Sequence, residues 1–481
     1  KGAYHMPSAP LLTTPAELNH ALSTARAAWQ AAPYPSCAER RARLAALRAA
    51  LQGHAGALAA AVSADFGQRS ADETRMAELF PTLLAIDHAR RHLRRWMRPQ
   101  RRGVSPWFWP ARAQVLPQPL GVVGVIVPWN YPLYLALGPL VDALAAGNRV
   151  LIKMSEYTPR TAAAVATLLA EALPGGEAQV ALGEVALAQT FASLPFDHLL
   201  FTGSTAVGRE VMRLASAQLT PVTLELGGKS PVLIAPGHDV ARAAACIAQG
   251  KLLNAGQTCV APDYVLLPRG ARAEFVRAFA QAVAASYPTL ADNPDYTSII
   301  HPRHWQRLHD GLAEARAAGA QTHACVGPDS EAALAAARKI APHLLWDVPA
   351  DCQLLREEIF GPILPLVEYE DWPAALAYVN ARPRPLALYL FDHDRQRVQA
   401  VLRQTIAGGV VVNDTLLHVV QDGLPFGGVG ASGMGQYHGH DGFLTFSKLK
   451  PVLYQSRWNA MPWLRPPYGR LARWLQALML R

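Results

Sequence analysis

Cysteine and lysine are both scarce in this chain of 481 residues. The five cysteines are odd in number and form no CxxC pair, which disfavours a disulfide framework and a zinc site. We therefore expect a reducing compartment, the cytoplasm. Only seven of the 45 basic residues are lysines, so we interpret the net charge of +9 as an arginine bias and expect no nucleic-acid partner.

Long apolar runs are also missing. The richest stretch, residues 133–146, is interrupted by Gly138, Pro139 and Asp142, so no bilayer-spanning segment is expected. The first residues show no basic region followed by an apolar one, so we expect no secretory signal. By contrast, 51% hydrophobic and 17% charged residues exclude general disorder. At about 150 residues per domain, the length predicts two to four units.

The first part of the chain has helical periodicity. Between residues 15 and 98, apolar side chains recur at spacings of three and four, as at Leu44, Leu47 and Leu51, which predicts amphipathic helices. Five prolines interrupt residues 99–119, where alternation near Val115 predicts a strand-forming arm.

After residue 120, apolar runs of strand length alternate with longer helical stretches. We expect strands at residues 122–127, 149–152, 179–182, 198–201, 222–224, 231–234, 264–267, 364–367, 387–391 and 409–412. This alternation predicts an α/β fold of two doubly wound domains, together with a small β arm for oligomerisation.

The predicted division of the chain follows these changes in pattern. Residues 1–98 and 119–224 form a nucleotide-binding domain, residues 225–420 a catalytic domain, and residues 99–118 and 421–460 bridging or oligomerisation segments. Residues 461–481 form an amphipathic tail, too short to span a bilayer. That tail either docks on this protein or a partner subunit, or rests on an anionic membrane surface.

Two segments are candidate nucleotide-binding sites. In FTGSTAVGR, Gly203 and Gly208 follow a predicted strand and open a helix, whose free N–H groups favour a phosphate, although a simple tight turn fits equally. In IKMSE, Lys153 and Glu156 end another strand, where they form either a ribose-binding pair or a solvated ion pair.

Three residues are candidates for catalysis, although each alone also fits a structural role. Cys259 lies among glycine and small polar residues in NAGQTC, where nearby donors can lower the pKa of a thiol. Glu225 ends a strand before Gly227 and Gly228, which suits a general base. Asn130, in VPWNYP, offers an amide to a developing oxyanion.

Taken together, these segments resemble the aldehyde dehydrogenase superfamily from about Pro119 to Gln455. The resemblance rests, in order, on PWNYP, KMSE, FTGSTAVG, LELGGKS, NAGQTC, EEIFGP and LPFGGVGASGMGQYHG. The last block and the preceding VVNDTLLHVVQDG are most similar to the class 3 branch and its coniferyl aldehyde dehydrogenase-like enzymes. One departure is Met154, where the family usually has proline, which puts the shape of that turn in doubt.

The resemblance implies a role for each candidate. Cys259 would be the nucleophile, Glu225 the base that activates the deacylating water, and Asn130 an oxyanion donor together with the Cys259 backbone N–H. The implied cofactor-binding residues are Trp129, Lys153, Glu156, Gly203, Ser204, Gly208, Glu358 and Phe360. Glu156 at the ribose 2′-hydroxyl favours NAD, and NADP stays open.

The implied reaction oxidises an aldehyde to a carboxylic acid through a thiohemiacetal and a thioester, without a metal. We expect Tyr131, Tyr134, Leu416 and His418 to line a pocket for an aromatic aldehyde, such as coniferyl aldehyde, or a medium-chain one. The resemblance also implies a homodimer. Two other functions are alternatives to aldehyde oxidation to the free acid. One is a CoA-acylating enzyme, which the presence of Glu225 disfavours, and the other is a non-catalytic binding or structural protein on the same fold.

Overall fold

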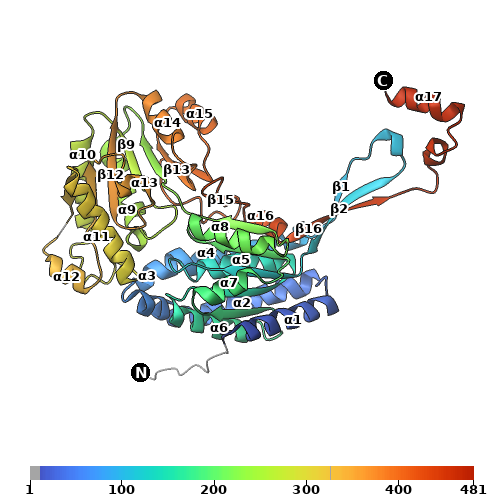
Figure 1. Ribbon diagram of the computed structural model, residues 1–481, viewed down its shortest axis with the longest axis horizontal. Helices are drawn as coiled ribbons and strands as arrows, with labels where there is room; N and C mark the ends of the chain where they lie inside the picture. Colours follow the sequence, from blue (N-terminus) through green and yellow to red (C-terminus); the bar gives the residue numbers. More distant parts are fainter. Residues whose placement is uncertain (1–10, 326, 481) are drawn as a thin grey trace.

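A computed structural model describes residues 11–325 and 327–480, which form two α/β bodies and a projecting arm (Figure 1). The first body contains a six-stranded sheet with the order β15-β7-β6-β3-β4-β5. Its strands are β3 Val122–Ile126, β4 Arg149–Met154, β5 Ala178–Leu182, β6 His198–Thr202, β7 Val222–Glu225 and β15 Gly433–Met434. All pairs are parallel except β15 with β7.

Helices cover both faces of this sheet. They are α1 Pro15–Ala31, α2 Cys37–Phe66, α4 Phe80–Trp96, α5 Tyr134–Ala146, α6 Pro159–Ala172, α7 Val185–Ala192 and α8 Thr205–Ser216. Alternate strand residues point to opposite faces. Val123 and Val125 therefore pack with α2, α4, α5 and α6, whereas Val122 and Ile126 pack with α1, α7 and α8. Between α2 and α4 lie the short helix α3 Ala71–Thr74 and the π-helical turn η1 Arg75–Leu79.

The second body contains a seven-stranded sheet with the order β10-β11-β12-β9-β8-β13-β14. Its strands are β8 Pro231–Ile234, β9 Tyr264–Pro268, β10 Gln321–Ala324, β11 His343–Trp346, β12 Ile363–Tyr369, β13 Ala387–Phe391 and β14 Gly409–Val412. Its helices are α9 Val240–Leu252, α10 Arg272–Ser286, α11 Pro302–Ala317, α12 Glu331–Ala336, α13 Gln353–Arg356, α14 Trp372–Asn380 and α15 Arg395–Gln404. Only β10 pairs antiparallel, with β11.

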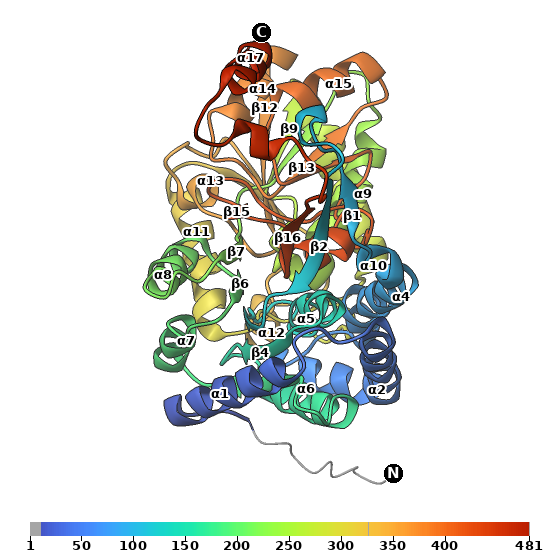
Figure 2. The same ribbon diagram turned by 90° about the vertical axis from the view of Figure 1, so that its right-hand side faces the viewer.

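The arm is a three-stranded antiparallel sheet of β1 Gln100–Arg102, β2 Arg112–Pro119 and β16 Ser447–Tyr454. The 3₁₀ turn η2 Pro106–Phe108 lies between β1 and β2, and helix α16 Gly439–Thr445 packs on α4 and α5 before β16 begins. After β16, the 3₁₀ turn η4 Met461–Leu464 leads to helix α17 Arg470–Met479. Figure 2 shows α17 at the opposite end of the molecule from α1, and Figure 1 shows it beyond the arm.

The expected α/β class with two parallel sheets is confirmed, and each expected strand is present within two residues of its expected ends. Strands β10 and β11 were not predicted; β10, QTHA, has no apolar pattern. Within residues 421–460, β15 pairs with β7 at the edge of the first sheet, a strand that the sequence did not predict. It is two residues long, and its Gly433 lies against Leu224, which leaves no apolar run to detect.

In the part of the chain that the structure describes, no helix combines the length and the apolar sequence needed to cross a membrane.

Candidate active site

The candidate residues lie at the carboxyl ends of four adjacent parallel strands. Asn130 follows β3, Lys153 lies near the end of β4, Gly203 follows β6 and Glu225 ends β7. The chain passes from β3 to β4 on one side and from β6 to β7 on the other, so the strand order reverses between β3 and β6. Open α/β sheets bind ligands at such a reversal, outside the carboxyl ends of the strands.

The loop from β6 to α8 is suited to a phosphate. Ser204 caps α8 by accepting a hydrogen bond from the Val207 N–H at 3.4 Å, and the Gly203 N–H donates to the Glu225 carbonyl at 2.9 Å. A Cβ on Gly208 would lie 2.5 Å from the buried Leu226 side chain, so a larger residue would require that side chain to move. The helix N-terminus and the close approach of the backbone fit a dinucleotide pyrophosphate.

At the end of β4, a buried cation and an exposed carboxylate lie close together. The Lys153 ammonium is 2% exposed and donates to the Met154 carbonyl at 2.7 Å. Burial lowers the pKa of Lys153, and the nearby charge of Glu156 opposes that change. Glu156 itself is exposed. Met154, the departure from the family pattern, is fully buried as the last residue of β4.

The cysteine loop is held in an unusual backbone conformation. The 3₁₀ turn η3, Leu253–Gly256, has positive φ at Asn254 (54°), Ala255 (53°) and Gly256 (76°). A Cβ on Gly256 would meet a backbone carbonyl at 2.3 Å, so that position requires glycine. The Gln257 side chain accepts from the Ile300 N–H at 3.0 Å and donates to the Asn254 and Ser298 carbonyls at 2.9 and 3.1 Å. These bonds fix the approach to Cys259.

Asn130 is bonded directly to this loop. Its side chain is buried, and its Nδ2 donates to the Gln257 carbonyl at 3.2 Å. Its own backbone carbonyl accepts from Arg69 at 3.1 Å and from Asn254 Nδ2 at 3.0 Å. Since an amide nitrogen carries two hydrogens, the second is available to a substrate oxygen.

Two acidic side chains, Glu225 and Glu358, are buried with few partners. Both carboxyl oxygens of Glu225 are buried without a hydrogen-bond partner in the described structure, and burial raises its pKa well above the usual value. A Cβ on Gly227 would collide with the Glu358 carboxylate, whose Oε1 also lacks a partner. Burial raises the pKa of Glu358 to about 8. Unpartnered buried oxygens of this kind indicate a site for a ligand or a reacting group.

The thiol of Cys259 is coupled to both acids. Burial raises the pKa of Cys259 to about 12, with further contributions from the charges of Glu358 and then Glu225. The structure therefore places both acids within electrostatic reach of the Cys259 thiol. The backbone N–H donors of Cys259 and Val260 act to lower the pKa of this thiol, but burial and the charges of the two acids outweigh them.

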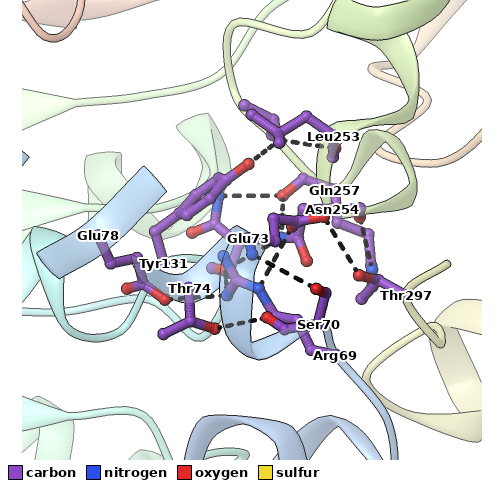
Figure 3. A network of polar contacts seen from close by, with 12 residues as sticks. Arg69, Ser70, Glu73, Thr74, Glu78, Tyr131, Leu253, Asn254, Gln257 and Thr297 are labelled. Atoms are coloured by element: carbon purple, nitrogen blue, oxygen red, sulfur yellow. Dashed lines mark hydrogen bonds and ion pairs between the residues drawn. The ribbon is translucent and has the colours of Figure 1, made fainter. Parts of the chain in front are cut away.

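A buried ionic network supports the same loop (Figure 3). The fully buried Arg69 guanidinium lies between Glu78 at 3.0 Å and Glu73 at 3.3 Å. It also lies over the Tyr131 ring, 4.8 Å from the centroid, and bonds the Asn130 carbonyl. The sequence does not predict this network, because its only sequence pattern is an Arg and a Glu spaced by four residues, which is common on helix surfaces.

The four residues expected to line a substrate pocket are largely enclosed. The Tyr131 hydroxyl shares a hydrogen bond of 2.8 Å with Thr258, next to Cys259, and the Tyr134 hydroxyl donates to the Val419 carbonyl at 3.3 Å. Leu416 has positive φ and packs on the core. Burial lowers the pKa of His418 to about 4, so its ring is neutral at pH 7. Their role in substrate binding stays a prediction.

The two aromatic residues expected near the cofactor contact each other. The rings of Trp129 and Phe360 lie 5.3 Å apart, edge to face, and Phe360 has a positive φ of 52°. This contact between the two rings brings the loop after β3 next to the segment that carries Glu358.

The described residues contain no group of three side chains able to hold a metal ion.

Comparison with known proteins identifies the family. The model described as "Aldehyde dehydrogenase family" matches residues 9–452. The chain belongs to the aldehyde dehydrogenase family. It is 53% identical over 445 residues to a Pseudomonas aeruginosa protein named "Probable coniferyl aldehyde dehydrogenase", with 92% of each chain covered. It is also 44% identical over 342 residues to rat "Aldehyde dehydrogenase family 3 member A2", covering 71% of this chain and 69% of the relative.

Solved structures are similar along the whole fold. The substrate-bound state of Staphylococcus aureus AldH has a TM-score of 0.89 and 35% identity, covering 96% of this chain and 99% of that one. A Mycobacterium tuberculosis aldehyde dehydrogenase complexed with NAD+ has a TM-score of 0.83 and 30% identity, covering 92% and 91%. The protein is therefore an aldehyde dehydrogenase that uses NAD(P), which confirms the resemblance and removes the alternative of a non-catalytic protein.

Proposed function

We propose that this enzyme oxidises an aldehyde to the carboxylic acid through a thiohemiacetal and a thioester on Cys259. The observation that carries the proposal is the coupling of the Cys259 thiol to the partnerless Glu225 carboxylate, beside a loop that Asn130 bonds at 3.2 Å. The Cys246 thiol has a different partner: it donates a hydrogen bond to the Asp414 carboxylate at 3.2 Å.

Each residue has a separate task in this reaction. Cys259 passes its thiol proton through Glu225 to solvent and forms the C–S bond to the aldehyde carbon, while Asn130 Nδ2 with the Cys259 N–H stabilises the oxygen that becomes negative. Oxidation of this adduct leaves a thioester. Glu225 then takes a proton from the water that cleaves the C–S bond, a task for which its raised pKa makes it a stronger base.

The cofactor proposed for this reaction is NAD, with NADP as the less favoured partner. When bound, it supplies the hydride acceptor. The loop of Gly203, Ser204 and Gly208 would hold its pyrophosphate, and Lys153 and Glu156 the adenosine ribose. The exposed Glu156 carboxylate would accept a bond from a ribose 2′-hydroxyl and would repel a 2′-phosphate.

The proposed substrate is an aromatic aldehyde such as coniferyl aldehyde, or a medium-chain aliphatic one. Support comes from the name of the Pseudomonas aeruginosa relative and from the aromatic residues near the cysteine loop, Tyr131 and Trp129.

We further propose a homodimer joined through the arm. We propose a cytoplasmic location as well, supported by five free cysteines.

The proposal is tested by rapid-mixing kinetics of NADH formation. Glu225→Gln should give a burst of about one NADH per active site and then stall, because acylation proceeds but the thioester is not hydrolysed. Cys259→Ala should give no burst, whereas the matched control Cys246→Ala should behave as wild type. Steady turnover by Glu225→Gln or activity of Cys259→Ala would refute the assigned roles. Product analysis with and without CoA separates the free acid from an acyl-CoA.

A further inference from the structure

The positive charge of the chain is concentrated in the arm and the tail. Residues 97–119 and 447–481 contain no Asp or Glu; their eleven cations are Arg98, Arg101, Arg102, Arg112, Lys448, Lys450, Arg457, Arg465, Arg470, Arg473 and Arg481. Because the whole chain has a net charge of +9, these eleven cations leave −2 on all other residues together. A uniform arginine bias therefore does not explain where the positive charge lies.

The same segments expose their tryptophans. Five of the eleven tryptophans lie there, namely Trp107, Trp109, Trp458, Trp463 and Trp474, with exposed fractions from 38% to 86%. The other six are buried or half-buried. Exposed tryptophans next to exposed arginines are typical of proteins at the boundary between water and lipid. There the tryptophan ring enters the headgroup region and the guanidinium pairs with phosphate.

Helix α17 separates the two kinds of side chain. Leu471, Trp474 and Leu478 follow the three- and four-residue spacing of one helix face and are all exposed. Arg473 is exposed on the other side, and Arg470, one turn before Trp474, is exposed at the edge of the apolar face. Figure 1 shows α17 beyond the arm and away from both α/β bodies. Although Ala472 of α17 is buried, the side chains of Leu471, Trp474 and Leu478 are therefore largely uncovered by their own chain.

We propose that residues 456–481 dock on an anionic lipid surface, with the Leu471, Trp474 and Leu478 face of α17 in the headgroup layer. Ten helical residues measure about 15 Å, so the helix lies along the surface and does not cross it. A second copy of the chain would have to place acidic groups opposite these arginines, and its own arm and tail contain none.

The test is sedimentation of the full-length protein with lipid vesicles. Wild type should bind vesicles containing phosphatidylglycerol, should bind phosphatidylcholine vesicles weakly, and should be released by salt. Leu471→Ser/Trp474→Ser/Leu478→Ser should reduce binding at least tenfold, and Arg470→Gln/Arg473→Gln several-fold. Tryptophan fluorescence of wild type should shift to shorter wavelength on binding.

A charge-matched control is available on the second body. Arg277 and Arg403 are exposed on α10 and α15, so Arg277→Gln/Arg403→Gln removes the same charge and should bind vesicles as wild type does. All variants should retain wild-type aldehyde oxidation, which verifies folding. Failure of wild type to bind the anionic vesicles would overturn the proposal.

Two further results would also overturn the proposal, because each would indicate a partner other than a lipid surface. Undiminished vesicle binding by the triple serine variant would show simple attraction to a polyanion, such as a nucleic acid. A change of oligomeric state in that variant, without any vesicle binding by wild type, would show that the face contacts a second copy.

Discussion

Replacing Arg69 tests whether the buried ionic network supports the catalytic loop. Arg69 is fully buried, and its guanidinium is the counter-charge of Glu73 and Glu78. Arg69→Met keeps much of the side-chain volume but leaves two buried carboxylates without a cation. It also removes the hydrogen bond to the Asn130 carbonyl.

The expected loss of stability is large. Removing one partner of a buried ion pair costs about 3–5 kcal/mol, since an uncompensated charge stays behind. Adding Glu78→Gln should recover part of that loss, because the amide oxygen can still accept from the Leu133 and Tyr134 N–H groups that Glu78 bonds at 2.7 and 3.1 Å. The double variant should therefore be more stable than the single one.

The loss should also depend on pH. Burial raises the pKa of Glu73 and Glu78 even with Arg69 present, and the Arg69 charge lowers both. Without Arg69 both pKa values rise further, so the folded state binds more protons than the unfolded state and stability falls as pH rises. Thermal unfolding should show a larger deficit for Arg69→Met at pH 8 than at pH 6. A loss below about 1 kcal/mol, or a deficit that does not change with pH, would refute this reasoning.

Three other substitutions address the site itself. Asn130→Ala should lower kcat about 10²–10³-fold, as loss of an oxyanion donor does, and a change in KM alone would contradict the assignment. Glu358→Gln removes a charge that raises the pKa of Cys259, so iodoacetamide should alkylate Cys259 several-fold faster at pH 8; an unchanged or slower rate would contradict the coupling. Glu156→Gln should raise kcat/KM with NADP relative to NAD, whereas an unaltered ratio would show that Glu156 does not contact the 2′ position.

Periodicity was sufficient to predict the parallel core of the fold. Strands such as β3 and β13 are fully buried, so their sequences are continuous apolar runs between turn residues. Where a strand is short, polar or rich in glycine, as in β10 and β15, pairing depends on the neighbouring strand, and the local sequence carries little information.

For the site, the motifs and their order in the sequence predict which residues take part, but not how deeply these residues are buried or which charges lie near them. Cys259 and Glu225 follow from family motifs, whereas the raised thiol pKa depends on burial and on Glu358, which is 99 positions away in the sequence. Arg69 contacts Asn130 across 61 positions, and no local pattern predicts that contact. The concentration of charge in the arm and tail is visible in the sequence, but its exposure on one projecting segment is visible only in the structure.

Mass spectrometry of the trapped intermediate tests the central claim most directly. Glu225→Gln enzyme is mixed with NAD and an aromatic aldehyde, quenched in acid and digested. We predict the added mass of the acyl group on the peptide containing Cys259, and its absence when NAD is omitted. An acyl group on another cysteine, or no adduct after a full burst of NADH, would contradict the proposed role of Cys259.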